Sequence, residues 1–100
     1  MSNPNKSEKK YHDDLCRIVG CICCRINGGF NDHVSIHHID GRTKPGAHMK
    51  VLPLCGFHHQ HGTEDDPSVH PWKARFEQRY GTQAQLQGVC EAILDYHNSP

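Results

Sequence analysis

The stretch SIHHIDGRTKPGAHMKVLPLCGFHH, residues 35–59, decides the fold of this chain because it joins two strand patterns to the start of a helix. Alternating residues predict a strand over 33–37, and the segment 40–46 is rich in turn-forming residues. A return strand is predicted over 49–54, followed by a helix from 55 to about 62. The stretch holds five histidines and one cysteine in 25 residues. The sequence therefore predicts a β-hairpin and helix that carry many metal-binding side chains.

Helices are predicted on both sides of the hairpin. On the N-terminal side, residues 1–6 are predicted to form a flexible tail, and an apolar stripe over 7–18 predicts a helix that ends at Gly20. On the C-terminal side, Pro71 is predicted to begin a helix that Gly81 closes.

A last helix is predicted to begin at a capping box formed by Thr82 and Gln85. Five side chains at helical spacing give it an apolar face: Leu86, Val89, Cys90, Ile93 and Leu94. A chain of 100 residues is long enough for one domain, and we expect residues 7–100 to form it. The predicted class is α+β, with an N-terminal helix and C-terminal helices around the hairpin.

The composition points to an intracellular, cytoplasmic protein. No apolar run approaches the roughly 20 residues of a membrane span, and the polar N-terminal residues do not resemble a signal peptide. In a reducing compartment, the six cysteines are expected to bind metal and not to form disulfides. The ten histidines support the same interpretation and also suit acid–base chemistry.

The net charge is zero, but the two halves of the chain differ. Residues 1–50 carry eight Lys and Arg against five Asp and Glu, whereas residues 51–100 carry three against six. A phosphate-bearing ligand is therefore expected on the half that holds the hairpin, although this asymmetry is small. Candidate contacts to the phosphate groups of such a ligand lie on or beside the long turn: Arg42, Lys44 and Lys50. Simple solvation of these three side chains is an equal alternative.

Two short pairs of cysteine and histidine predict a structural zinc site. A CxxC and a CxxH lie about 30 residues apart and supply four ligands: Cys21, Cys24, Cys55 and His58. Such a site would add folding free energy to a domain with a small core. Cys23 is an alternative to Cys24, although the CxxC spacing favours Cys24. The competing interpretation makes these cysteines buried apolar residues, as we expect for Cys16 and Cys90 on helical stripes.

The remaining histidines of the hairpin predict a second, open site. These are His37, His38, His48 and His59. At the end of a strand, one of two adjacent imidazoles can bind a metal while the other faces a substrate, and His59 directly follows a zinc ligand. Three other histidines are predicted to be solvated: His12, His33 and His97. His61 is predicted to lie at a solvated helix end, and His70 either binds a metal or packs structurally.

These residues resemble a known family. The segment HHIDGRTKPGAHMKVLPLCGFHH, preceded by GCICC, resembles the HNH nucleases with the ββα-metal fold. Within that superfamily, residues 19–81 resemble the phage recombination-enhancement nucleases, which are described as RecA-dependent. The resemblance includes GRTKPGAH and HPWKARFEQRYGT and covers most of the chain.

The resemblance implies a role for each histidine of the second site. His38 matches the general base that activates water, and His37 and His59 match ligands of a catalytic metal. The Asn of many HNH proteins would fall near Lys50, so His48 is its expected substitute, as a metal ligand or as a group that orients the base. The same resemblance supports the four structural zinc ligands, with His58 in place of the more usual cysteine.

The predicted function is therefore hydrolysis of DNA phosphodiester bonds, in phage or prophage recombination. The implied cofactors are a structural Zn²⁺ and a catalytic Mg²⁺ or other divalent cation, and the implied partners are DNA and the RecA filament. The alternative is a zinc-binding recognition module without catalysis. That alternative explains the four zinc ligands but not the cluster of His37, His38 and His59.

Overall fold

The computed structural model describes residues 3–100, so residues 1–2 of the predicted tail lie outside the described part of the chain. The centre of the molecule is an antiparallel pair, β1 (Val34–His38) and β2 (Val51–Cys55). Val34 pairs with Cys55 at one end, and His38 pairs with Val51 at the end next to the long turn. Both strands lie one or two residues later in the chain than predicted, and the α+β class is confirmed.

The N-terminal helix α1 (Lys6–Asp14) begins within the segment predicted to be a tail. Asn5 and Glu8 form a capping box that satisfies the first free backbone N–H groups, which explains the early start. The chain continues in a wider, π-helical turn, η1 (Leu15–Val19). Gly20 ends this turn with a φ of 69°, as predicted.

Two segments that carry candidate metal ligands form short helical turns. Cys21 caps the first of them, α2 (Ile22–Ile26), which includes Cys24. The helix predicted after β2 is one π-helical turn, η3 (Phe57–His61), and Gly62 follows it. A short 3-10 helix, η2 (Ala47–Met49), lies between the long turn and β2.

The C-terminal helices differ from the sequence prediction at two points. Helix α3 (Lys73–Tyr80) begins two residues after Pro71, so Pro71 precedes the helix and does not open it. Helix α4 (Gln83–His97) begins at the predicted capping box of Thr82 and Gln85. Val89 is 44% exposed, so its place on the buried face was wrong, because it lies at the edge of the apolar stripe.

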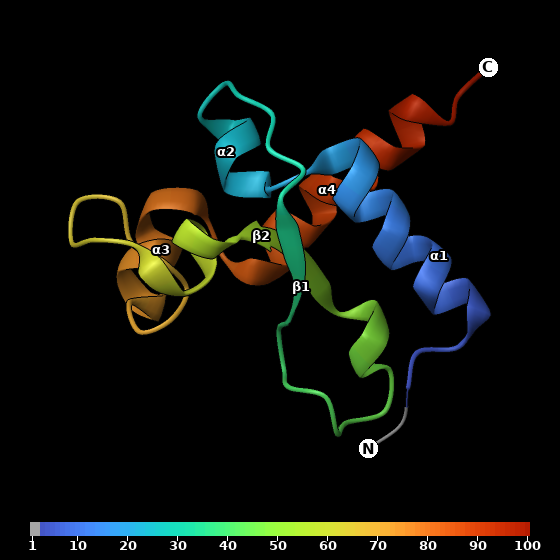
Figure 1. Ribbon diagram of the computed structural model, residues 1–100, viewed down its shortest axis with the longest axis horizontal. Helices are drawn as coiled ribbons and strands as arrows, with labels where there is room; N and C mark the ends of the chain where they lie inside the picture. Colours follow the sequence, from blue (N-terminus) through green and yellow to red (C-terminus); the bar gives the residue numbers. More distant parts are fainter. Residues whose placement is uncertain (1–2) are drawn as a thin grey trace.

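The core forms where η1, α2, β2 and α4 meet. Helix α4 packs against both η1 and β2, and every residue of β2 is buried. Figure 1 shows the hairpin in the middle, with α1 on one side and α3 on the other. Fully buried side chains from these elements fill the interior: Leu15, Val19, Ile22, Val51, Leu52, Leu54, Phe76 and Cys90. None of the described helices is long and apolar enough to cross a membrane.

Candidate functional site

The four predicted zinc ligands lie together at the end of the hairpin away from the long turn. Cys24 Sγ is 3.9 Å from Cys55 Sγ, and His58 Nδ1 lies 3.3–3.7 Å from the three sulfurs. A tetrahedral zinc with metal–sulfur bonds of about 2.3 Å requires sulfur–sulfur edges of about 3.8 Å and sulfur–nitrogen edges of about 3.6 Å. The observed separations match these edges, so the donor set fits a structural zinc ion.

The charges in this cluster also fit a bound cation. Hydrogen bonds donated to its sulfur by Cys23 and then by His58 lower the pKa of Cys21 to about 3, although burial opposes the shift. Burial and then the neighbouring sulfurs of Cys21 and Cys55 raise the pKa of Cys24 to about 12. Cys24 therefore keeps its proton beside the Cys21 thiolate, and a bound divalent cation would favour the loss of that proton. Cys23 is fully buried and lies outside the group of four.

The far side of the His58 ring faces a polar network from the C-terminal half. His58 Nε2 lies 3.3 Å from both carboxylate oxygens of Asp66 and 3.1 Å from the Tyr80 hydroxyl. The Tyr80 hydroxyl donates to Asp66 and accepts from the amide of Asn27 at 3.0 Å. Metal-binding histidines commonly donate their second N–H to such a group, which fixes the ring and its tautomer. Sequence patterns did not identify Asp66 and Tyr80, because neither residue belongs to the CxxC or CxxH spacing that indicates a zinc site.

A second cluster consists of His37, His59 and His70. The candidate ligand nitrogens of these three residues all lie within 4.8 Å of one another. The ring centroid of His37 is 5.2 Å from those of both His59 and His70. Three imidazoles without a fourth protein ligand are typical of a metal site with an open position for water or substrate. We call this group the histidine trio.

Two backbone hydrogen bonds bring His70 into the trio. The N–H of Val69 donates to the carbonyl of His58 at 2.9 Å, and the N–H of His70 donates to the carbonyl of His59 at 3.1 Å. The loop between them turns back at Gly62, where a Cβ would overlap the backbone of residues 66–68. Only glycine allows this close approach. His70, whose role the sequence left open, therefore lies beside His59.

His48 lies elsewhere, beside the predicted general base. His48 Nδ1 is 3.0 Å from His38 Nε2, and the trio among the described residues does not include His48. Of its two expected roles, a metal ligand or a group that orients the base, this position is the one expected for the second. His12 is half-buried, and its Nε2 donates to the carbonyl of His48 at 2.6 Å. The prediction that His12 is solvated was wrong, because α1 packs against η2.

The electrostatics around His38 favour the neutral imidazole. Burial and then the positive charge of Arg42 lower the pKa of His38 to about 4. Burial also lowers the pKa of His37 and of His59. At neutral pH these rings are uncharged, so each has a lone pair that can take a proton or bind a metal.

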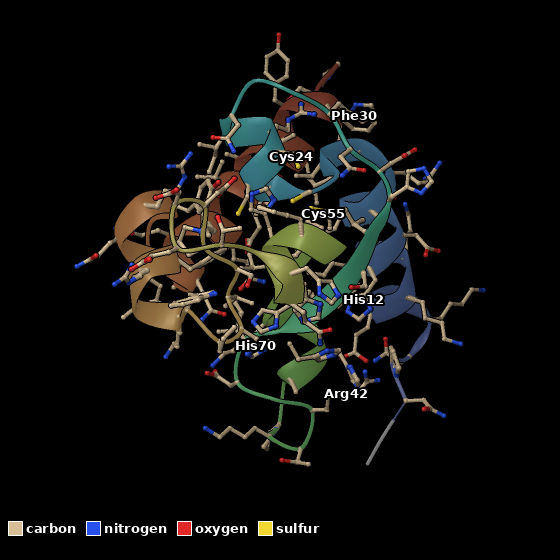
Figure 2. All side chains as sticks on the ribbon, turned by 60° about the vertical axis from the view of Figure 1, so that its left-hand side comes forward. His12, Cys24, Phe30, Arg42, Cys55 and His70 are labelled. Atoms are coloured by element: carbon tan, nitrogen blue, oxygen red, sulfur yellow. The ribbon has the colours of Figure 1, made fainter. Side chains whose placement is uncertain are left out.

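The remaining candidate residues are exposed on the long turn. Arg42 and Lys44 are open to solvent, whereas the ammonium of Lys50 lies 3.8 Å from Asp40. In Figure 2, Cys24 and Cys55 lie towards one end of the hairpin and Arg42 lies towards the other, with His12 and His70 between them. The region around the histidines is therefore flanked by the basic turn.

A comparison with protein families identifies the chain. The model of the recombination-enhancement, RecA-dependent nucleases matches residues 4–95. The chain belongs to this family. The match covers α1 through most of α4, so it includes both clusters of metal-binding residues.

Membership in this nuclease family gives the two clusters a context. The family is named for a RecA-dependent nuclease that acts in recombination. A nuclease needs groups that activate water and stabilise charge on phosphate, and neutral imidazoles with an open metal position can do both. The local sequence patterns found four members of this region and left the role of His70 open, whereas His12 is found only through its tertiary contact.

Proposed function

We propose that the protein is a metal-dependent DNA endonuclease of the HNH type, with a ββα-metal core formed by β1, β2 and η3. The observation that carries the proposal is the position of neutral His38 at the end of β1, next in sequence to a ligand of the histidine trio. Cys21, Cys24, Cys55 and His58 would hold a structural zinc, and this site would stabilise the fold without taking part in the reaction.

His38 acts as the general base in the proposed mechanism. Its Nε2 lies 3.0 Å from Nδ1 of His48, and in the tautomer in which the Nε2–H of His38 donates to His48, the lone pair of His38 lies on Nδ1. That atom takes a proton from water as the water oxygen attacks phosphorus. The bond between phosphorus and the leaving oxygen breaks, and the leaving oxygen receives a proton from solvent. The low pKa of His38 keeps the base in its active form at neutral pH.

The histidine trio would hold the catalytic cation. When bound there, a divalent cation such as Mg²⁺, Mn²⁺ or Zn²⁺ stabilises the negative charge on the phosphate and the leaving oxygen. His37 and His59 keep their predicted roles as ligands, and His70 joins them in the place expected for His48. His48 then orients the base, while Arg42 and Lys44 contact the DNA backbone.

A plasmid-nicking assay with His38→Ala tests the mechanism. We expect a loss of about 10²–10⁴ in rate with zinc content and folding unchanged, because only the proton acceptor is removed. His97→Ala is the matched control, since His97 is exposed at the end of α4. Cleavage by His38→Ala at the wild-type rate would rule out this general base and favour the zinc-binding recognition module.

RecA dependence is proposed from the family name and from the charge of the chain. The protein has eleven Lys and Arg and no net charge, and five of these cations form salt bridges: Lys10, Arg17, Lys50, Arg75 and Arg79. Nonspecific DNA affinity depends on the number of phosphates that cations neutralise, so affinity for naked duplex should be low. We expect much faster cleavage of a duplex paired within a RecA filament than of the same naked duplex, at fixed metal and low salt. Equal rates would exclude the dependence on RecA.

A further inference from the structure

A buried glutamine links the first turn of α4 to the histidine trio. Gln83 is only 6% exposed, although its amide carries two polar atoms. Burying an amide is costly unless each polar atom has a partner. Gln83 Oε1 lies 2.8 Å from His37 Nε2, and Gln83 Nε2 lies 3.1 Å from Glu77 Oε2. His37 is itself 6% exposed, so this contact is shielded from water.

The chemistry of the three groups sets the direction of every hydrogen bond. A carboxylate only accepts, so the NH₂ of Gln83 must face Glu77 and its carbonyl oxygen must face His37. A carbonyl oxygen also only accepts, so Nε2 of His37 must carry the proton. In a neutral imidazole the lone pair then lies on Nδ1, the one atom of His37 that remains able to bind a metal.

The backbone holds this chain of contacts in place. Glu77 lies on α3 and Gln83 opens α4, and the turn between them is fixed by the capping box of Thr82 and Gln85. The amide of Gln83 on α4 therefore contacts the His37 ring from outside the hairpin, and Glu77 on α3 holds the other end of that amide. A glutamine at the first position of a helix has no local need to be buried, since solvent can satisfy its amide.

We propose that Gln83 and Glu77 are positioning residues that hold His37 in its Nε2–H tautomer and so keep Nδ1 available to a metal. This inference rests on the proposed role of the trio as a metal site. Groups that accept the second N–H of a metal-binding histidine fix the ring and increase its basicity. Their loss commonly weakens metal binding by about 10–100-fold.

The test uses Gln83→Met, which has a similar length but cannot accept the hydrogen bond. The protein is loaded with one equivalent of zinc to fill the cysteine site and is then titrated with Ni²⁺ or Mn²⁺. We expect Gln83→Met to weaken the second metal by about 10–100-fold and to leave the first zinc in place. In the form with zinc alone, ¹⁵N NMR should show His37 as Nε2–H in the wild type and as a mixture of tautomers in the variant.

Control variants separate this role from a loss of packing. Gln87→Met removes an amide one turn further along α4, where it donates to the Tyr11 hydroxyl, and should leave the second metal unaffected. The exchange Glu77→Gln with Gln83→Glu keeps the net charge and an acceptor for His37, and should restore metal affinity to the wild-type level or above. If Gln83→Met does not fold, Glu77→Ala removes the group that orients the amide and should give the same mixture of tautomers.

The outcomes distinguish this inference from the proposed function. A second metal that binds Gln83→Met as tightly as the wild type, with His37 still in the Nε2–H form, would overturn the inference alone. A wild-type protein that binds no second metal would overturn the metal site, and with it this role for Gln83.

Discussion

Replacing Cys24 with serine tests how much of the fold depends on the proposed structural zinc. Cys24 Sγ lies 3.9 Å from Cys55 Sγ and 3.7 Å from His58 Nδ1, so it occupies one corner of the tetrahedron. A hydroxyl on the shorter serine side chain is a poor substitute for a thiolate. The variant therefore keeps three of the four ligands, and only Cys21 still joins the α2 segment to Cys55 and His58.

The magnitude follows from the free energy of a structural zinc. Such sites contribute about 10–16 kcal/mol, so one ligand in four corresponds to a loss of at least about 2.5–4 kcal/mol. For a domain of this length, a loss of about 1 kcal/mol lowers Tm by roughly 4–8 °C. Cys24→Ser should thus lower Tm by at least about 10–30 °C, because the loss is a large part of the roughly 5–15 kcal/mol by which such domains are stable.

The assay combines metal content with thermal unfolding. Zinc per chain is measured after gel filtration in a weak chelator, and Tm is followed by far-UV circular dichroism. Cys16→Ser is the matched control, because Cys16 is a partly exposed thiol outside the group of four. One full zinc per chain and an unchanged Tm in Cys24→Ser would refute the assignment, and Cys23 would be the next ligand to test.

Three further changes test the histidine region. Because burial lowers the pKa of folded His38 from 6.5 to about 4, the unfolded chain binds more protons between these values. Urea unfolding should therefore show stability that falls as the pH drops from about 6.5 to about 4, and a smaller fall in His38→Gln. His59→Ala and His70→Ala should each raise the metal concentration needed for half-maximal cleavage at least about tenfold, with activity partly recovered at high metal. Gly62→Ala should cost about 1–3 kcal/mol in urea unfolding, because its Cβ overlaps the backbone of residues 66–68, and should weaken the second metal as His70→Ala does.

Local rules in the sequence predicted most of the scaffold. Gly20 and Gly81 end helical segments as expected, and the capping box at Thr82 starts α4, because these features depend on a few neighbouring residues. The hairpin followed from alternation and turn chemistry, with strand ends displaced by one or two residues. The start of α1 was missed because the capping box of Asn5 and Glu8 lies in a polar segment that has no apolar stripe.

Contacts between distant segments could not be predicted in the same way. His70 reaches His37 only because residues 69–70 pair with 58–59 through the backbone, and that pairing leaves no periodic pattern. His12 and His48 are 36 residues apart and meet through the packing of α1 on η2. From its place in the sequence, Gln83 is an ordinary polar residue at the start of a helix. Only its burial against His37 in the structure distinguishes it from an exposed glutamine.

The turn η3 explains why the two clusters occur in one small domain. His58 and His59 are adjacent in sequence, yet His58 faces the cysteine sulfurs and His59 faces His37 and His70. The same two residues accept the backbone hydrogen bonds that bring His70 into the trio. A zinc ion that fixes His58 therefore also fixes the carbonyl groups and the ring on which the trio depends. A recognition module would need only the zinc site, whereas a nuclease also needs the neighbouring imidazoles to be held rigidly. The five residues of η3 contribute a ligand to the zinc site and a histidine to the trio.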